Sequence, residues 1–146
     1  MAILIDYNQV MLANLFVALG NHTNTDLSED LIRHMFLNSV RKIRTKFHKE
    51  YSEIVICADG KNSWRKDAFK YYKAARKKTR DESEIDWPEL YRIMDVIRNE
   101  LDQFFPYKVL KFDRVEADDI IGSICKSRKT FEIGKNYCDL INELCI

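Results

Sequence analysis

Two short stretches, AILID (residues 2–6) and EIVICAD (residues 53–59), are almost wholly apolar and each ends in an aspartate. Neither stretch alternates apolar with polar residues, so both faces of each are expected to be buried, as in the strands of a parallel sheet. The chain between them has helical spacing, and a helix is the usual connection between parallel strands. The two stretches therefore predict strands of one parallel sheet.

The rest of the chain continues this alternation. Helices are predicted over residues 10–19, 63–78, 88–104 and from residue 116 onward, with a long one that starts at Asp26 and Glu29 and ends near residue 49. A third strand is predicted over residues 109–112. The order β-α-α-β-α-α-β-α predicts an α/β fold, a parallel sheet with helices on both faces.

Length and composition limit the classes of protein to consider. The 146 residues are 46% hydrophobic and carry a formal charge of +1, which favours one globular domain and argues against a uniformly basic nucleic-acid binder. No stretch approaches the roughly 18 apolar residues of a membrane helix, and the apolar opening is too short for a signal peptide. We expect a soluble, cytoplasmic protein with no membrane partner. The four cysteines lack zinc-site spacing.

Carboxylates follow all three predicted strands. Asp6 and Asp59 end the first two, and Glu116, Asp118 and Asp119 follow the third by a few residues. Ligands of open parallel sheets bind at the carboxyl ends of the strands, and clustered carboxylates suit Mg²⁺ or Mn²⁺. Each acid has a structural explanation as well, since such residues often cap helices or sit in a first turn. Helical spacing separates Asp118 from the other two, so all five converge only if Glu116 precedes the helix.

A strongly basic segment follows Asp59. Between residues 61 and 80, nine Lys and Arg residues stand against Asp67 alone, with Trp64, Phe69, Tyr71 and Tyr72 among them. Cations for phosphates and rings for unpaired bases are typical of single-strand nucleic-acid binding, whereas a cationic run by itself is more often a solvated face. An acidic link, DESEID (residues 81–86), comes directly after the segment.

Together these motifs resemble the N-terminal half of the flap endonuclease and 5′-3′ exonuclease family. The resemblance rests on the two strands ending in aspartate, on SWRKDAFKYYKAAR (residues 63–76) and on EADD (residues 116–119). Within the family it is closest to the ribonucleases H of T-even-type bacteriophages. It implies a PIN-like, 5′-nuclease N-terminal domain over residues 1–126, with an arch-like basic segment at about residues 61–86. Residues 127–146 resemble nothing in the family and are expected to form a divergent tail.

The resemblance also implies a chemistry. It predicts hydrolysis of phosphodiester bonds near the 5′ ends of DNA or RNA·DNA hybrids during replication, with Mg²⁺ or Mn²⁺ as cofactor and a 5′ single strand or flap admitted under the arch. The implied metal ligands are Asp6, Asp59, Glu116, Asp118 and Asp119. The implied nucleic-acid contacts are Arg65, Lys66, Lys70, Tyr72, Lys73 and Arg76. Of these, Lys73 and Arg76 are expected to be catalytic because they stabilise developing charge, and Tyr72 to stack on a terminal base.

The sequence departs from the family after Asp119. A further strand ending in Asp-x-Asp and a helix-three-turn-helix are expected there, and neither is found, so the sheet looks truncated. A complementary C-terminal nuclease fragment is accordingly an expected partner. Three alternatives remain open: a non-catalytic single-strand-binding fragment of a split nuclease, a compact PIN-like ribonuclease, and an α/β domain whose acids only cap helices.

Overall fold

The computed structural model describes residues 2–20 and 28–126. Three parallel strands lie in the order β1-β2-β3: β1 (Ala2–Asp6), β2 (Glu53–Cys57) and β3 (Lys108–Leu110). The helices are α1 (Tyr7–Gly20), α2 (Glu29–Phe47), α3 (Arg65–Ala68), α4 (Ala74–Asp81), α5 (Trp87–Phe104) and α6 (Ala117–Lys126). The predicted α/β fold with a parallel sheet is confirmed. None of the helices in the described ranges is long and apolar enough to cross a membrane.

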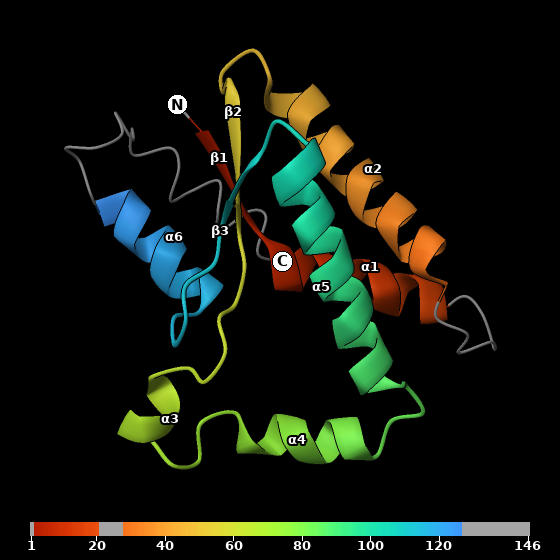
Figure 1. Cartoon of the computed structure of the whole chain (residues 1–146), viewed down its shortest axis with the longest axis vertical. Helices are drawn as coiled ribbons and strands as arrows, with labels where there is room; N and C mark the ends of the chain where they lie inside the picture. Colours follow the sequence, from red (N-terminus) through yellow and green to blue (C-terminus); the bar gives the residue numbers. More distant parts are fainter. Residues whose placement is uncertain (1, 21–27, 127–146) are drawn as a thin grey trace.

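Helices cover both faces of the sheet, as predicted. Alternate strand residues, among them Ile3, Ile5 and Ile56, pack with α1, α2 and α5 in the larger apolar core. The residues between them pack on the other side against the apolar face of α6, and include Leu4 and Val55. In Figure 1, α1, α2 and α5 lie on one side of the strands and α6 lies on the other. Burial on both faces explains why apolar and polar residues do not alternate in β1 and β2.

Several helix boundaries differ from the prediction because side-chain caps set them. Helix α1 begins directly after Asp6, whose carboxylate accepts a hydrogen bond from the Gln9 N–H. Helix α2 begins at Glu29 with Ser28 as its N-cap, whereas Asp26 falls outside the described residues. Asp86 caps α5 in the same way, with Pro88 in the first turn as expected.

Beyond the sheet, β2 and β3 continue as two hydrogen-bonded loops, which we call the paired loops (residues 58–64 and 110–115). Four backbone hydrogen bonds of 2.8–2.9 Å join them, including one from the Gly60 N–H to the carbonyl of Val115. The pairing shortens the third strand, which was predicted to reach residue 112 but ends at Leu110. Because α6 follows immediately, the paired loops fix its first turn beside the end of β2.

The segment predicted as one helix over residues 63–78 is instead broken in two, which is a correction. Helix α3 ends at Ala68, Phe69 is extended, and Lys73 takes a left-handed conformation with φ of 55° before α4 begins. We call residues 64–81, which contain both helices, the basic segment. Figure 1 shows α4 crossing beneath the carboxyl ends of the strands, joined to the sheet by the chain after β2 and by α5.

Candidate functional site

Asp6 and Asp59 lie at the carboxyl ends of their strands, and each also caps a helix. Asp6 Oδ1 accepts a hydrogen bond of 2.9 Å from the Gln9 N–H in α1. Asp59 Oδ1 accepts one of 2.8 Å from the Ala117 N–H, the first residue of α6. The Asp59 N–H in turn donates to Asn8 Oδ1 at 3.3 Å. These bonds join the ends of β1 and β2 to the start of α6.

Asp6 carries the electrostatic signature of a crowded acidic edge. Burial raises its pKa from 3.8 to about 6, and the neighbouring charges of Asp59 and Asp118 add to the increase, although the Gln9 N–H opposes it. Among the described residues, Asp6 forms no ion pair with a basic side chain. Three carboxylates therefore share a partly desolvated edge where negative charge is disfavoured.

The start of α6 supplies the other acids. Glu116 stands just before the helix, as convergence required, and its N–H donates to Asp119 Oδ2 at 3.1 Å, which is one half of a capping box. The Glu116 side chain is 8% exposed and that of Asp119 22%. Asp118 is exposed and influences Asp6. As helical spacing predicts, Asp118 is separated from the other two.

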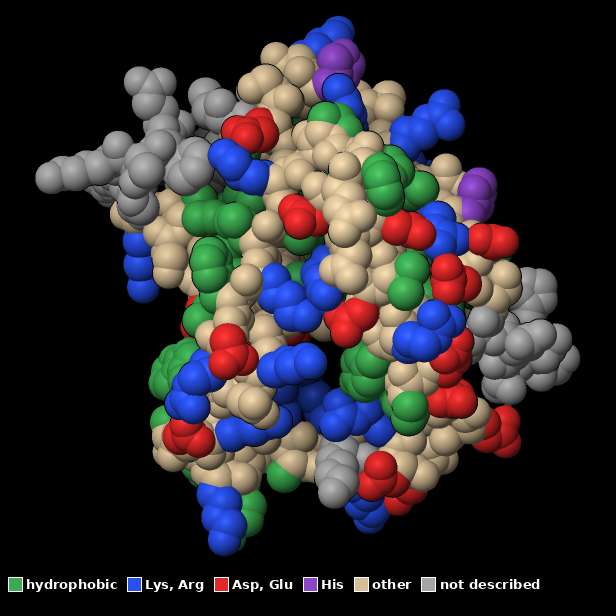
Figure 2. All heavy atoms as spheres, in the orientation of Figure 1, with side chains coloured by type: hydrophobic (Ala, Val, Ile, Leu, Met, Phe, Trp, Pro, Cys, Tyr) green, Lys and Arg blue, Asp and Glu red, His purple; other side chains and the backbone are tan. Residues whose placement is uncertain are grey.

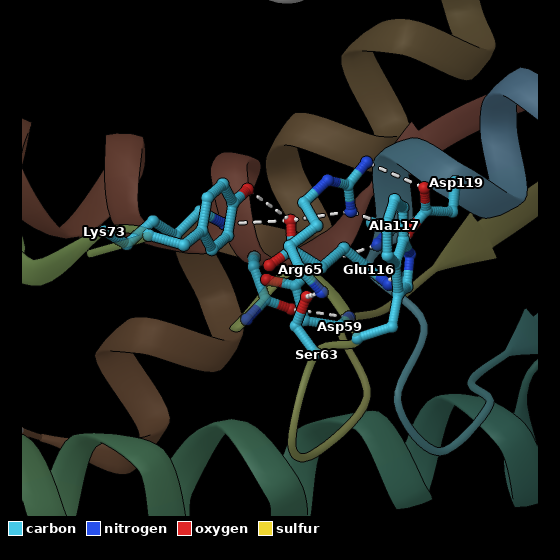
Figure 3. Close-up of polar contacts among 10 residues, drawn as sticks. Asp59, Ser63, Arg65, Lys73, Glu116, Ala117 and Asp119 are labelled. Atoms are coloured by element: carbon cyan, nitrogen blue, oxygen red, sulfur yellow. Dashed lines mark hydrogen bonds and ion pairs between the residues drawn. The ribbon is translucent and has the colours of Figure 1, made fainter. Parts of the chain in front are cut away.

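The basic segment reaches Glu116 and Asp119 directly (Figure 3). The Arg65 guanidinium makes two hydrogen bonds of 2.7 Å to the carboxylate of Asp119 and one of 3.2 Å to Glu116 Oε2. The same Glu116 oxygen accepts from the Tyr72 hydroxyl at 2.9 Å and from Lys73 Nζ at 3.0 Å. Burial works to raise the pKa of Glu116, but hydrogen bonds led by those of Lys73 and Tyr72 outweigh it and hold the pKa below its ordinary value.

Aromatic rings complete this contact. The Arg65 guanidinium lies 5.1 Å from the centroid of the Trp64 ring and 5.9 Å from that of Tyr72, and Lys73 Nζ lies 5.1 Å from the Tyr72 ring. The Trp64 indole N–H donates to Asp119 Oδ2 at 3.1 Å. Arg65 is thus held by two carboxylates and two rings.

The predicted nucleic-acid contacts on the basic segment differ in their surroundings. Lys66, Lys70 and Arg76 are exposed, and within the described residues none of them contacts the five carboxylates. Tyr72, predicted to stack on a base, is half-buried with its hydroxyl on Glu116. Arg65 and Lys73, predicted to contact phosphates, are paired with acids in this structure.

Comparison with known proteins supplies the family. Residues 1–137 match the model of the 5′-3′ exonuclease N-terminal, resolvase-like domain. The chain belongs to this family. It is also 37% identical over 127 residues to a protein named ribonuclease H from Enterobacteria phage T4; the match covers 84% of this chain and 41% of the phage protein. The chain therefore spans about two-fifths of the length of this curated relative. The family resemblance read from the motifs is confirmed, and the match continues past residue 126, where the domain was expected to end.

The five carboxylates of this exonuclease domain have the charge and the hard oxygen atoms that suit a divalent cation. Their positions, however, do not form a metal site. Within the described ranges, no three Asp, Glu, His or Cys side chains come close enough together to hold one metal ion. Glu116 and Asp119 are turned toward the basic segment, whereas Asp6 and Asp59 each use Oδ1 for a cap. Asp59 Oδ2 takes part in none of the hydrogen bonds or ion pairs among the described residues, whereas the Asp6 carboxylate also interacts with the Asn8 N–H. The acids thus form two groups: Asp6, Asp59 and Asp118 on one side, Glu116 and Asp119 on the other.

Sequence reasoning missed three residues of the candidate site. Asn8 anchors the Asp59 backbone, Ser63 is buried and hydrogen-bonds to Glu116, and Trp64 donates to Asp119. Trp64 was noticed only as a ring for stacking. Asn8 lies two residues after Asp6, but no sequence pattern indicated its contact with a residue 51 positions away.

The raised pKa of Asp6 predicts a pH-dependent effect of Asp6→Asn. The unfolded carboxyl titrates near 3.8 and the folded one near 6, so the free energy of unfolding of the wild-type chain falls as pH rises through that window. Asparagine keeps the capping oxygen and never ionises. In EDTA we expect the variant to be more stable by about 2 kcal/mol at about pH 7.5 and no more stable at about pH 4.

Urea unfolding followed by circular dichroism at the two pH values measures this difference. Asp113→Asn is the matched control, because Asp113 is an exposed acid in the paired loops. A stability difference for Asp6→Asn that does not change with pH would contradict the prediction.

Proposed function

We propose that this domain belongs to a divalent-metal-dependent 5′-nuclease that hydrolyses phosphodiester bonds near the 5′ ends of DNA or RNA·DNA hybrids during replication. The observation that carries the proposal is the meeting of opposite charges at one sheet edge. The uncompensated group of Asp6, Asp59 and Asp118 lies beside a basic segment whose Arg65 and Lys73 already reach the neighbouring acids. Membership in the 5′-3′ exonuclease family and the similarity to the phage T4 protein support it.

The proposed cofactor is Mg²⁺ or Mn²⁺, held by Asp6, Asp59 and Asp118 with Glu116 beside them. Their hard oxygen atoms and mutual repulsion suit such an ion. When bound, it would neutralise phosphate charge and lower the pKa of a water molecule. The cap on Asp59 uses one carboxylate oxygen and leaves the other available, and the Gln9 N–H fixes the Asp6 carboxylate at the same edge.

The basic segment is the proposed nucleic-acid contact. Figure 2 shows Lys and Arg side chains gathered around a hollow above α4. Lys66, Lys70 and Arg76 are exposed and available for phosphates. Lys73 Nζ lies at the acidic edge itself, 3.0 Å from Glu116, where it would face a phosphate brought to that edge. The proposed partners are accordingly nucleic acids with a 5′ single strand or flap.

One observation favours a second candidate, a non-catalytic single-strand-binding fragment. Among the described residues no three possible ligands converge, and the basic segment needs no metal to keep its contacts with α6. Calorimetric titration with Mn²⁺ separates the candidates. Binding of Mn²⁺ supports the nuclease, whereas oligonucleotide binding without Mn²⁺ binding supports the fragment.

Hydrolysis of 5′-labelled flap DNA and RNA·DNA hybrid in Mg²⁺ tests the nuclease directly. The chain should be assayed alone and together with the part of the phage T4 relative that the match leaves out, because a complementary C-terminal fragment is a proposed partner. Release of short 5′ products in either assay is the expected result. Absence of cleavage in both would overturn the catalytic proposal.

Binding of single-stranded DNA should depend steeply on salt. With about four phosphates contacted, affinity should fall about 50-fold between ~50 and ~200 mM NaCl. Fluorescence anisotropy of a labelled oligo-dT in EDTA measures this, and replacing Lys66, Lys70 and Arg76 together by glutamine should flatten the dependence. Affinity that is the same at both salt concentrations would show that the segment does not bind phosphates.

A further inference from the structure

We propose that Asp119 is a positioning residue, not a metal ligand: with Arg65 and Trp64 it ties the basic segment to the sheet edge. This inference rests on the proposed function only in taking the segment as the single-strand contact. The tie itself needs neither metal nor nucleic acid.

Both oxygen atoms of the Asp119 carboxylate accept hydrogen bonds. Its Oδ1 accepts from Arg65 Nη2 at 2.7 Å, and its Oδ2 accepts from Arg65 Nη1, the Trp64 indole N–H and the Glu116 N–H at 2.7, 3.1 and 3.1 Å. Three of these four donors lie on Oδ2 and one lies on Oδ1, so most of the roughly four lone-pair sites of the carboxylate are occupied. A metal ion at Asp119 would compete with a bidentate, charge-assisted pair, which is among the stronger polar contacts in proteins. The neighbouring Asp118 is exposed and forms no such bonds with the residues that the structure describes.

Arg65 is equally committed. Its side chain is 24% exposed and lies against the rings of Trp64 and Tyr72. Both terminal nitrogens donate hydrogen bonds to carboxylates. Lys66 and Lys70, by contrast, are exposed. Arg65 therefore differs from its basic neighbours, and we assign it to the tie, not to phosphate binding.

The segment depends on such ties because no core holds it. Helix α3 has no buried residue, and none of the α4 side chains that the structure describes is buried. The chain between the helices is not helical, with Phe69 extended and Lys73 left-handed. At the far end, Arg80 contacts Tyr91 and the Trp87 ring on α5. At the near end the Asp119 tie lies beside the Arg114–Asp67 ion pair and the bonds from Tyr72 and Lys73 to Glu116, and Arg76 lies between the two ends.

Asp119→Asn and Asp118→Asn form a matched pair that tests the tie, since both remove one negative charge from the first turn of α6. In EDTA, Asp119→Asn should speed trypsin cleavage within residues 66–80 about tenfold, because a charge-assisted contact is lost. Asp118→Asn should leave the rate of trypsin cleavage unchanged. Arg65→Gln removes the same tie from the other side and should speed cleavage as Asp119→Asn does, which keeps the test valid should one variant fail to fold.

Oligonucleotide affinity gives a readout whose sign separates positioning from charge. Loss of a negative charge alone should strengthen oligo-dT binding, as we expect for Asp118→Asn. Loss of positioning should weaken binding about threefold in Asp119→Asn despite the same charge change. A stronger binding in Asp119→Asn would show that Arg65 had been released to bind phosphate, and would overturn the proposal.

The affinity for Mn²⁺ tests directly whether Asp119 is a metal ligand. Calorimetry with Mn²⁺ should show a larger loss for Asp118→Asn than for Asp119→Asn. Equal losses, or unchanged trypsin cleavage in Asp119→Asn and Arg65→Gln, would overturn the assignment of Asp119. If the wild-type chain binds no Mn²⁺, the proposed nuclease fails, and the trypsin and oligonucleotide comparisons in EDTA still decide the role of Asp119.

Discussion

Asp59→Asn is expected to lower the rate of metal-dependent hydrolysis by about 10³-fold or more, because it removes one carboxylate from the proposed ligand group. The fold should survive the change. Asp59 Oδ1 accepts the Ala117 N–H, and asparagine keeps an oxygen that can accept the same bond. The variant therefore separates the chemical role of Asp59 from its structural one.

The measurement uses the labelled flap DNA in whichever assay shows cleavage by the wild-type chain, with Mn²⁺ affinity by calorimetry alongside. Asp113→Asn again serves as control, because it is the same substitution at an exposed acid of the paired loops. We expect the control to cleave at the wild-type rate. Cleavage by Asp59→Asn at the wild-type rate would show that the carboxylates at this sheet edge do not take part in hydrolysis.

The acids of this edge show that structural and functional interpretations of a motif need not exclude each other. Asp6 and Asp59 cap α1 and α6, as the structural interpretation holds. Asp59 does so with one oxygen, and its cap leaves the second oxygen at the carboxyl edge of the sheet, where ligands of such sheets bind. A sequence pattern identifies the residue but does not show which carboxylate oxygen accepts the capping bond and which is left for a ligand.

The sheet could be predicted because it follows from local information. Two apolar runs without alternation can be satisfied only by strands covered on both faces, and residues 2–6 and 53–57 are such strands. The break between α3 and α4 could not be predicted in this way. The basic segment has residues that form helices readily, but Tyr72 and Lys73 bond to Glu116, more than 40 residues away, and these contacts accompany the left-handed Lys73.

The same limit applies to the candidate site. Strand ends placed Asp6 and Asp59 at one edge, but the helix predicted from residue 116 onward begins at Ala117, and it is the structure that leaves Glu116 before it. The choice of partner for each acid depends on rotamers and on the paired loops, which the spacing of residues does not encode. Sequence reasoning therefore assigned Arg65 to phosphate, whereas the structure pairs it with Asp119.

Gly60→Ala should destabilise the domain by about 4 kcal/mol, the largest loss of stability we expect from a single added methyl group in this chain. A Cβ at Gly60 would lie 1.8 Å from the Phe112 carbonyl oxygen and 2.9 Å from that of Val115. Both obstacles are backbone atoms of the paired loops and cannot rotate away. The loops would have to separate, which breaks the bond from the Gly60 N–H to Val115 and shifts the start of α6.

Gly122→Ala is the matched control for this substitution. A Cβ at Gly122 in α6 meets nothing within 4 Å, so the same added methyl group should stabilise the helix by about 0.5–1 kcal/mol. Urea unfolding in EDTA measures both variants. Asp59 and Glu116 lie next to the contact that the added methyl group would disturb. Gly60→Ala should therefore also weaken Mn²⁺ binding even where the variant remains folded. A Gly60→Ala variant as stable as the wild-type chain would mean that the paired loops can separate without cost, and that they do not hold the two groups of acids in place.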